Sequence, residues 1–177
     1  MKNSILSIAV FVITLISSLQ LTAQEFKSLD KSPMDVAAFP NSYKISDKIV
    51  KVTYSRPQLK GRDLVKLAPP EKVWRTGANE AAEITFYKDV IFGGKALKAG
   101  TYSLFTIPSE DGDWTVIINK AKNVWGSYYY KQDQDVIRVS GKTSKADKNI
   151  EAFSMMFDKD MTLKMGWGNT VISVPIK

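Results

Sequence analysis

The chain has 177 residues, carries 25 Lys and Arg against 18 Asp and Glu for a formal net charge of +7, and contains neither Cys nor His. The missing cysteines exclude disulfides, a thiol nucleophile, zinc–thiolate sites and an anchor on an acylated cysteine. The missing histidines exclude a Ser-His-Asp triad and remove the commonest general base and transition-metal ligand. We therefore predict no cofactor and no metal site. Only a hard cation such as calcium would suit the remaining oxygen ligands.

Residues 1–23 have the layout of a secretory signal peptide. Lys2 gives a positive start, an apolar run extends over 5–16, and the small residue Ala23 ends the segment. The apolar run is shorter than the roughly 20 residues that a membrane-spanning helix needs. We predict cleavage after Ala23 and export to the periplasm or the exterior, with an uncleaved N-terminal anchor as the alternative. The mature chain, 24–177, would be a single domain without a transmembrane segment.

The rest of the chain alternates apolar and polar residues in short runs separated by turns. This period of two is typical of strands, because successive side chains point to opposite faces. Helical signals are few: residues 121–134 have room for one turn of helix, and 30–38 is ambiguous. The predicted strands occupy 49–55, 82–86, the hairpin 90–97 around Gly93–Gly94, 101–107, 114–119, 135–140, 150–157, 161–167 and 171–176.

These runs predict an all-β fold, a single antiparallel β-sandwich of about nine short strands with little helix. Gly168–Asn169 predicts a turn between the last two strands. The lysine-rich run 142–148 predicts a solvated loop, and attraction to an anionic envelope surface is its functional alternative. The longest stretch without a pattern, 57–73, is expected to fold over the core or to serve a function.

Hydrogen-bonding side chains crowd the segment 74–80. Followed backwards, the inward face of strand 82–86 reaches Glu80, whereas Glu83 falls on the outward face. Arg56 likewise continues the inward face of strand 49–55. Because a buried charge needs a partner, we expect Glu80 to be mostly buried and paired with at least one of three arginines, Arg56, Arg62 or Arg75.

Two interpretations of these charges remain open. One is a structural ion pair that closes an end of the sandwich. The other is a rim pocket for an anionic or hydroxyl-rich ligand, since the planar guanidinium of Arg can bind a pair of oxygen atoms. The candidate ligand-binding residues are Arg56, Arg62, Arg75, Asn79 and Glu80.

A second cluster is aromatic and acidic, with Trp125, Tyr128 and Asp133 as secondary candidates. Rings beside carboxylates can stack on a sugar while the carboxylates hold its hydroxyls. The alternative is a loop pinned by its rings against the sheet edge. The Asp-x-Asp pairs 111/113, 133/135 and 158/160 are interpreted as turn residues, because the calcium-binding EF-hand pattern is absent.

The heptapeptide Trp74–Glu80, followed by the run 100–108, resembles the bacterial family of domain of unknown function 2911. The motifs at 54–57, 60–62, 125–126 and 135–139 also match, so the resemblance covers nearly all of 24–177. It implies an exported, mostly β domain from bacteria with two membranes, and no established activity. After residue 62 the chain lacks the Phe-Gly and Val-Pro-Tyr-Gly common in the family, and it has Ala82 where Thr is common, so no fixed loop shape is implied there.

Together these observations predict a non-catalytic binding or interaction module of the cell envelope for a polyhydroxylated or anionic ligand. A carboxylate-based hydrolase of envelope glycans is one alternative, and it would need two carboxylates about 5 Å or 6.5–9.5 Å apart. A purely structural domain is the other. No motif indicates nucleic-acid binding.

Overall fold

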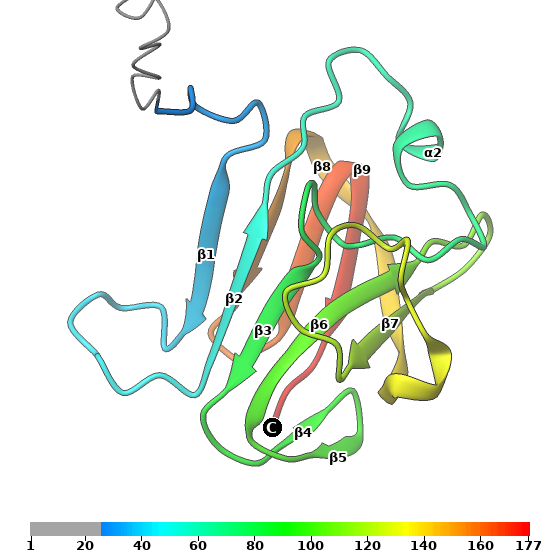
Figure 1. The fold of residues 1–177 in the computed structure, drawn as a ribbon. Helices are drawn as coiled ribbons and strands as arrows, with labels where there is room; N and C mark the ends of the chain where they lie inside the picture. Colours follow the sequence, from blue (N-terminus) through cyan, green and yellow to red (C-terminus); the bar gives the residue numbers. More distant parts are fainter. Residues whose placement is uncertain (1–25) are drawn as a thin grey trace, which may run out of the picture.

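The computed structural model describes residues 26–177, so the predicted signal peptide lies outside the described residues. The described part is nearly all β (Figure 1). Its two short helical turns are α2 (Leu64–Leu67) and η1 (Gln132–Gln134). The strands are β1 (Met34–Phe39), β2 (Val50–Ser55), β3 (Ala82–Phe86), β4 (Val90–Phe92), β5 (Lys95–Leu97), β6 (Gly100–Ile107), β7 (Trp114–Asn119), β8 (Asp135–Phe157) and β9 (Leu163–Val174).

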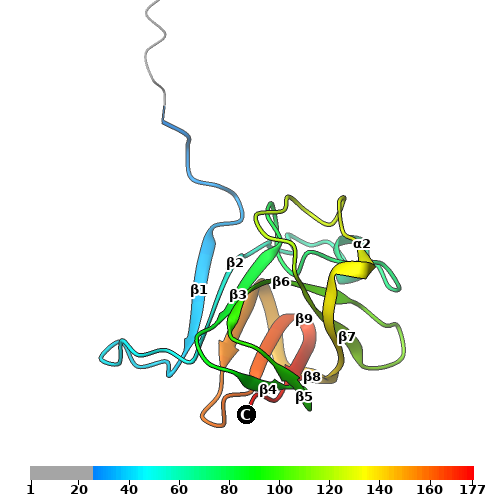
Figure 2. The same cartoon turned by 60° about the horizontal axis from the view of Figure 1, so that its bottom comes forward.

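Seven strands form one antiparallel sheet in the order β1-β2-β3-β6-β7-β8-β9, and β4 and β5 form a separate hairpin. The predicted all-β, antiparallel fold with little helix is confirmed. Its arrangement as a two-sheet sandwich is not confirmed, because the large sheet curls around its own interior (Figure 2). None of the helices in the described part is long and apolar enough to cross a membrane.

The long strand β8 corrects the sequence-based prediction of two strands and a lysine loop. Residues up to Gly141 pair with β7, and the pairs with β9 are formed by 142–145, Ile150 and 154–157. The lysine run therefore lies within a strand, and its lysines are exposed. The predicted turn at Gly168–Asn169 is also wrong, because β9 continues through it. Gly168 has φ +58°, and register shifts in the β8–β9 pairing accommodate the irregularity.

The segment just after β2 pairs with β8 across the curl. Gln58 forms an isolated bridge with Ala152 of β8, and the backbone N–H of Leu59 donates to the Glu151 carbonyl. The Phe153 N–H donates to the Pro57 carbonyl in the same stretch. The segment 57–73 thus begins by extending the sheet, and it buries Leu59 and Ala68 in the core, as expected of a segment folded over it.

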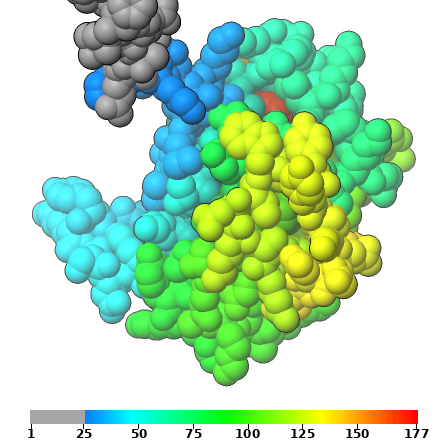
Figure 3. Space-filling view, viewed as in Figure 1, coloured from blue at the N-terminus to red at the C-terminus, as the bar shows by residue number. Residues whose placement is uncertain are grey.

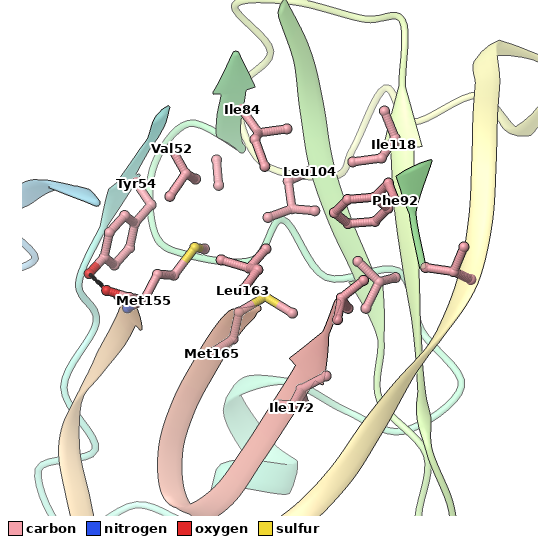
Figure 4. Close-up of a cluster of buried hydrophobic side chains, with 14 of the residues drawn as sticks. Val52, Tyr54, Ile84, Phe92, Leu104, Ile118, Met155, Leu163, Met165 and Ile172 are labelled. Atoms are coloured by element: carbon pink, nitrogen blue, oxygen red, sulfur yellow. Dashed lines mark hydrogen bonds between the residues drawn. The ribbon is translucent and has the colours of Figure 1, made fainter. Parts of the chain in front are cut away.

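The main core fills the inside of the curl with side chains from nearly every strand (Figure 4). Trp74 stacks on Trp167 with ring centroids 5.3 Å apart, and both rings are buried. A smaller cluster on the outer face contains Ala81, Phe105 and Ile117. Val124 and Tyr130 pack against that cluster, so the loop 120–134, rather than a second sheet, covers it.

Candidate functional site

Glu80 is exposed and forms no ion pair with any described residue, so its predicted burial and pairing are wrong. The alternation cannot be followed back to Glu80, because β3 begins only at Ala82. Two residues of the preceding segment, Thr76 and Asn79, have left-handed backbone conformations with φ +54° and +61°. The chain therefore turns before the strand begins, and Glu80 instead bridges to Trp125.

Arg56 is committed to structural contacts. Its Nε donates to the Phe153 carbonyl at 3.1 Å, and its Nη2 donates to Ser154 Oγ at 2.7 Å. Nη1 pairs with Asp35 Oδ2 at 3.2 Å. The guanidinium thus joins β1, the end of β2 and β8, and it has little left to offer a ligand.

The other two candidate arginines do not join Glu80 either. Arg62 is exposed and donates to the carbonyls of Leu59 and Gln58 at 2.9 and 2.7 Å, which holds its own turn. Arg75 Nε is buried without a hydrogen-bond partner within the described chain. No contact of the described residues accounts for this unpaired nitrogen. The predicted cluster of five residues is therefore not one site.

A cleft opens where β2 and β3 separate. The two strands pair only as far as Thr53 opposite Glu83. Beyond that point the N–H groups of Ala81 and Ala82 donate away from β2, to the carbonyls of Val124 and Arg75 at 2.9 and 3.0 Å. The part of β2 after Thr53 therefore has no paired β3 residue beside it, and a recess is left between β2 and the segment that precedes β3.

This recess, which we call the Glu80 cleft, has a volume of about 260 Å³. Glu83 lies on the outward face, as predicted, and its Oε1 accepts a hydrogen bond from the Asn123 N–H at 2.8 Å. Figure 3 shows the cleft region as green residues between the blue N-terminal strand and the yellow-green loop. The lining residues are Met34, Thr53, Tyr54, Ser55, Glu80, Ala81, Glu83 and Asn123.

The aromatic cluster of the sequence lies directly beside this cleft. The backbone of Trp125 bridges to Glu80, and the Gly126 N–H donates to the Asn79 carbonyl at 2.9 Å. The polar cluster and the aromatic cluster are separate in the sequence, and the structure brings Asn79 and Glu80 together with Trp125. We call the three exposed rings of this loop the aromatic tip; they belong to Trp125, Tyr128 and Tyr129, exposed by 56, 78 and 77 %. Asp133, the last secondary candidate, is exposed in η1.

A buried polar network holds the base of the 120–134 loop, and sequence analysis missed it. The fully buried Asn119 side chain accepts from the Ala121 N–H and donates to the Lys131 carbonyl and to Asp135, at 2.9, 3.0 and 2.7 Å. Asp135 Oδ2 also accepts from Tyr130 Oη at 2.6 Å. The signal that could have found it is an amide and a carboxylate placed at the two strand ends that flank one loop.

Burial and this network raise the pKa values of two side chains, Tyr130 and Arg138. Burial, followed by the hydrogen bond to Asp135, raises the pKa of Tyr130 to about 12. The hydrogen bond from Arg138 Nε to Asp135 at 2.6 Å raises the pKa of the Arg138 guanidinium above its usual value. Tyr130 thus stays a neutral donor at any physiological pH, and it also packs edge-on against Phe105 at 5.2 Å.

The acidic pairs act as turn and strand anchors. Asp158 Oδ1 accepts from the N–H groups of Asp160 and Thr162, and this turn confirms the prediction for that pair. Asp113 accepts from the Thr143 N–H at 2.7 Å, and that bond holds the pKa of the Asp113 carboxyl below its ordinary value. Across residues 26–177, no three acidic side chains gather as a possible metal site.

Comparison with known proteins yields one match. The model of the family described as "Protein of unknown function (DUF2911)" matches residues 32–176. No curated protein and no solved structure matches the chain. Because the match spans nearly the whole described chain, the protein belongs to the DUF2911 family of proteins of unknown function.

Proposed function

We propose that this protein is an exported, non-catalytic binding module of the cell envelope that holds a polyhydroxylated ligand in the Glu80 cleft. The observation that carries the proposal is the backbone bridge between Glu80 and Trp125, which pairs a residue of the cleft wall with a residue whose ring is exposed. Carboxylates accept hydrogen bonds from hydroxyl groups, and a ring offers an apolar face to the C–H side of a sugar. The charged start and apolar run of residues 1–23 support export.

The charge of the cleft favours a neutral ligand over an anionic one. Glu80 and Glu83 both line the recess, and like charges would repel an anion there. Arg56 and Arg62 donate to protein groups elsewhere. The cleft is therefore lined by groups that can bind hydroxyls, and no Lys or Arg of residues 26–177 lines it to bind a phosphate or a carboxylate.

Residues 24–177 should bind neutral glycans on an array, with affinities measured by calorimetry. Glu80→Gln replaces the charged acceptor by a neutral amide, and charge-assisted hydrogen bonds are roughly twice as strong as neutral ones, so the dissociation constant should rise about 3- to 10-fold. Asp47→Asn is the matched control, because Asp47 lies in the loop at the opposite end of β2. Absence of binding to every glycan, or an equal loss in both variants, would contradict the proposal.

A carboxylate-based glycan hydrolase is the second candidate, because two carboxylates line one cleft. Such enzymes place their acid and their nucleophile or base on either side of the scissile bond. Incubation of bound glycans with the wild type and with Glu80→Gln and Glu83→Gln separates the two functions. Turnover by the wild type that both variants lose, with the fold intact, would replace the binding proposal by the enzymatic one.

A further inference from the structure

The aromatic tip gathers three exposed rings within five residues of one loop. Of the four tryptophans, Trp74, Trp114 and Trp167 are exposed by only 2–6 %, whereas Trp125 is exposed by 56 %. Tyr128 and Tyr129, a few residues further along, are exposed still more. Clustered exposed apolar groups on a monomer commonly mark a binding surface.

The tip is displayed by a well-anchored loop. The Lys120 N–H donates to the Gln134 carbonyl at 3.0 Å, so the two ends of the loop lie together. Asn119 binds both ends from inside, and Tyr130 is held by Asp135. Compact loops with closed ends are frequently functional, and a surface ordered in advance loses less entropy on binding.

The loop that carries the tip continues from the wall of the cleft, which Asn123 lines. Trp125 adjoins Glu80 through the backbone bridge. The ring of Tyr128 covers Gly126, because a Cβ atom built on Gly126 would lie 2.8 Å from two of the ring carbons. The chain therefore leads from the cleft, at Glu80 and Asn123, directly to the residues of the aromatic tip.

The size of the cleft limits what it can enclose. At about 260 Å³ it falls below the roughly 300–1,000 Å³ typical of pockets that bury a drug-sized ligand. One small ring fits this space, and further units of a larger ligand would lie outside it, where the tyrosines of the tip are.

From this continuity we infer that the ligand is an oligosaccharide chain, with one sugar in the Glu80 cleft and the following sugars stacked on Tyr128 and Tyr129. This inference rests on the proposed function and adds the ligand's length and direction. Stacking on exposed rings depends little on which sugar is present, so the tip would contribute affinity for chain length while the cleft selects the terminal unit.

The test compares monosaccharides with chains. The probes are glucose, galactose and N-acetylglucosamine and their β-1,4-linked tetramers, measured by calorimetry. The wild type should bind at least one tetramer about tenfold or more tightly than its monomer. The double variant Tyr128→Ala/Tyr129→Ala should lose that preference and keep the affinity for the monomer. Tyr43→Ala is the matched control, since Tyr43 is 90 % exposed in the loop before β2.

The outcomes separate the inference from the proposed function. Equal affinity for monomers and tetramers in the wild type, or a preference that survives in the double variant, overturns the inference and leaves the cleft proposal standing. Failure to bind any probe or any arrayed glycan overturns both. A third outcome is that the wild type and Tyr43→Ala self-associate, the double variant does not, and all three bind glycans equally. That result would assign the tip to a protein interface instead.

Discussion

Arg56 joins three separate segments of the chain through one guanidinium group. Its nitrogen atoms contact a β8 carbonyl, a β8 hydroxyl and the carboxylate of Asp35 in β1. Hydrogen bonds of a charged group are stronger than neutral ones, and their loss also leaves the acceptors unpaired. The side chain is 36 % exposed, so water replaces part of what is lost.

We expect Arg56→Met, which keeps the aliphatic stem, to lower the free energy of unfolding by about 1.5–3 kcal/mol. Arg62→Met is the control, because Arg62 is exposed and bonds only to its own turn. That change should stay within about 0.5 kcal/mol. Urea titrations monitored by circular dichroism measure both values, and equal midpoints for the two variants would contradict the assignment.

Tyr130 makes the stability of the loop base depend on pH in the alkaline range. Its pKa is about 12 in the folded protein, against about 10 for an unperturbed tyrosine. Between these values the folded state holds a proton that the unfolded state has released. The contribution is therefore complete below about pH 10 and is lost as the pH rises through about 12.

Carbon-13 NMR of labelled tyrosine rings should show one resonance that titrates near pH 12 and disappears in Tyr130→Phe. Asp135→Asn should lower the pKa of Tyr130, because the hydrogen bond to Asp135 raises it. A Tyr130 resonance that titrates near pH 10 in the wild type would show that the ring is not held as described.

At the same scale, the candidate site was only partly readable from the sequence. Residue type alone pointed to Glu80, Asn79 and Trp125, which do come together. The pairing of Glu80 with arginine failed, because it assumed that the strand extends back past Ala82, where β3 in fact begins. The two partners of Arg56 in β8 lie 97 and 98 residues away, beyond the reach of any local pattern.

Among the elements, β8 depends on a glycine at its change of partner. A Cβ atom on Gly141 would lie 2.5 Å from Ile172 Cγ2 and 2.7 Å from Val116 Cγ2. Both of these residues are buried in the main core, so neither can move away without disturbing its neighbours. The absence of a side chain lets β7 and β9 approach the same point of β8.

Gly141→Ala should therefore destabilise the protein by about 1–3 kcal/mol, the usual cost of overpacking. Gly112→Ala is the matched control, since the nearest atom to its added Cβ is Ser109 Oγ at 3.6 Å. Melting temperatures of the two variants provide the measurement. Equal stability of the Gly141→Ala and Gly112→Ala proteins would contradict the prediction. It would show that the side chains around Ile172 can move to make room for the added methyl group.

Strand positions were the most predictable part of the fold. The runs 82–86, 90–92, 95–97 and 114–119 match their strands residue for residue, because alternation and glycine turns are local signals. The continuity of β8 and β9 was not predictable, since exposed lysines and Gly168 resemble turn residues when read alone. What keeps them in strands is their pairing with each other, which is a tertiary property.

For the whole molecule, the strand pattern that predicts a sandwich is equally compatible with the curled sheet that the structure shows. The alternating strands have a buried face and an exposed face in either architecture, so the pattern does not distinguish two packed sheets from one sheet closed on itself. The hydrogen bonds between 57–59 and 151–153 hold the two sides of the curl together, and this link between distant segments has no local signal in the sequence. A loop, rather than a second sheet, then covers the outer apolar cluster of Phe105 and Ile117.

The hydrogen bond between Tyr54 and the Met155 backbone, 101 residues apart, has a consequence for the order in which the protein can fold. Strands β2, β3 and β6 are synthesised before β8 and β9, whose residues pack with theirs in the main core. Folding dominated by such distant contacts is slow. The chain must therefore be almost fully synthesised before its core can close, and until then its first strands present an apolar surface to any chaperone or neighbouring chain.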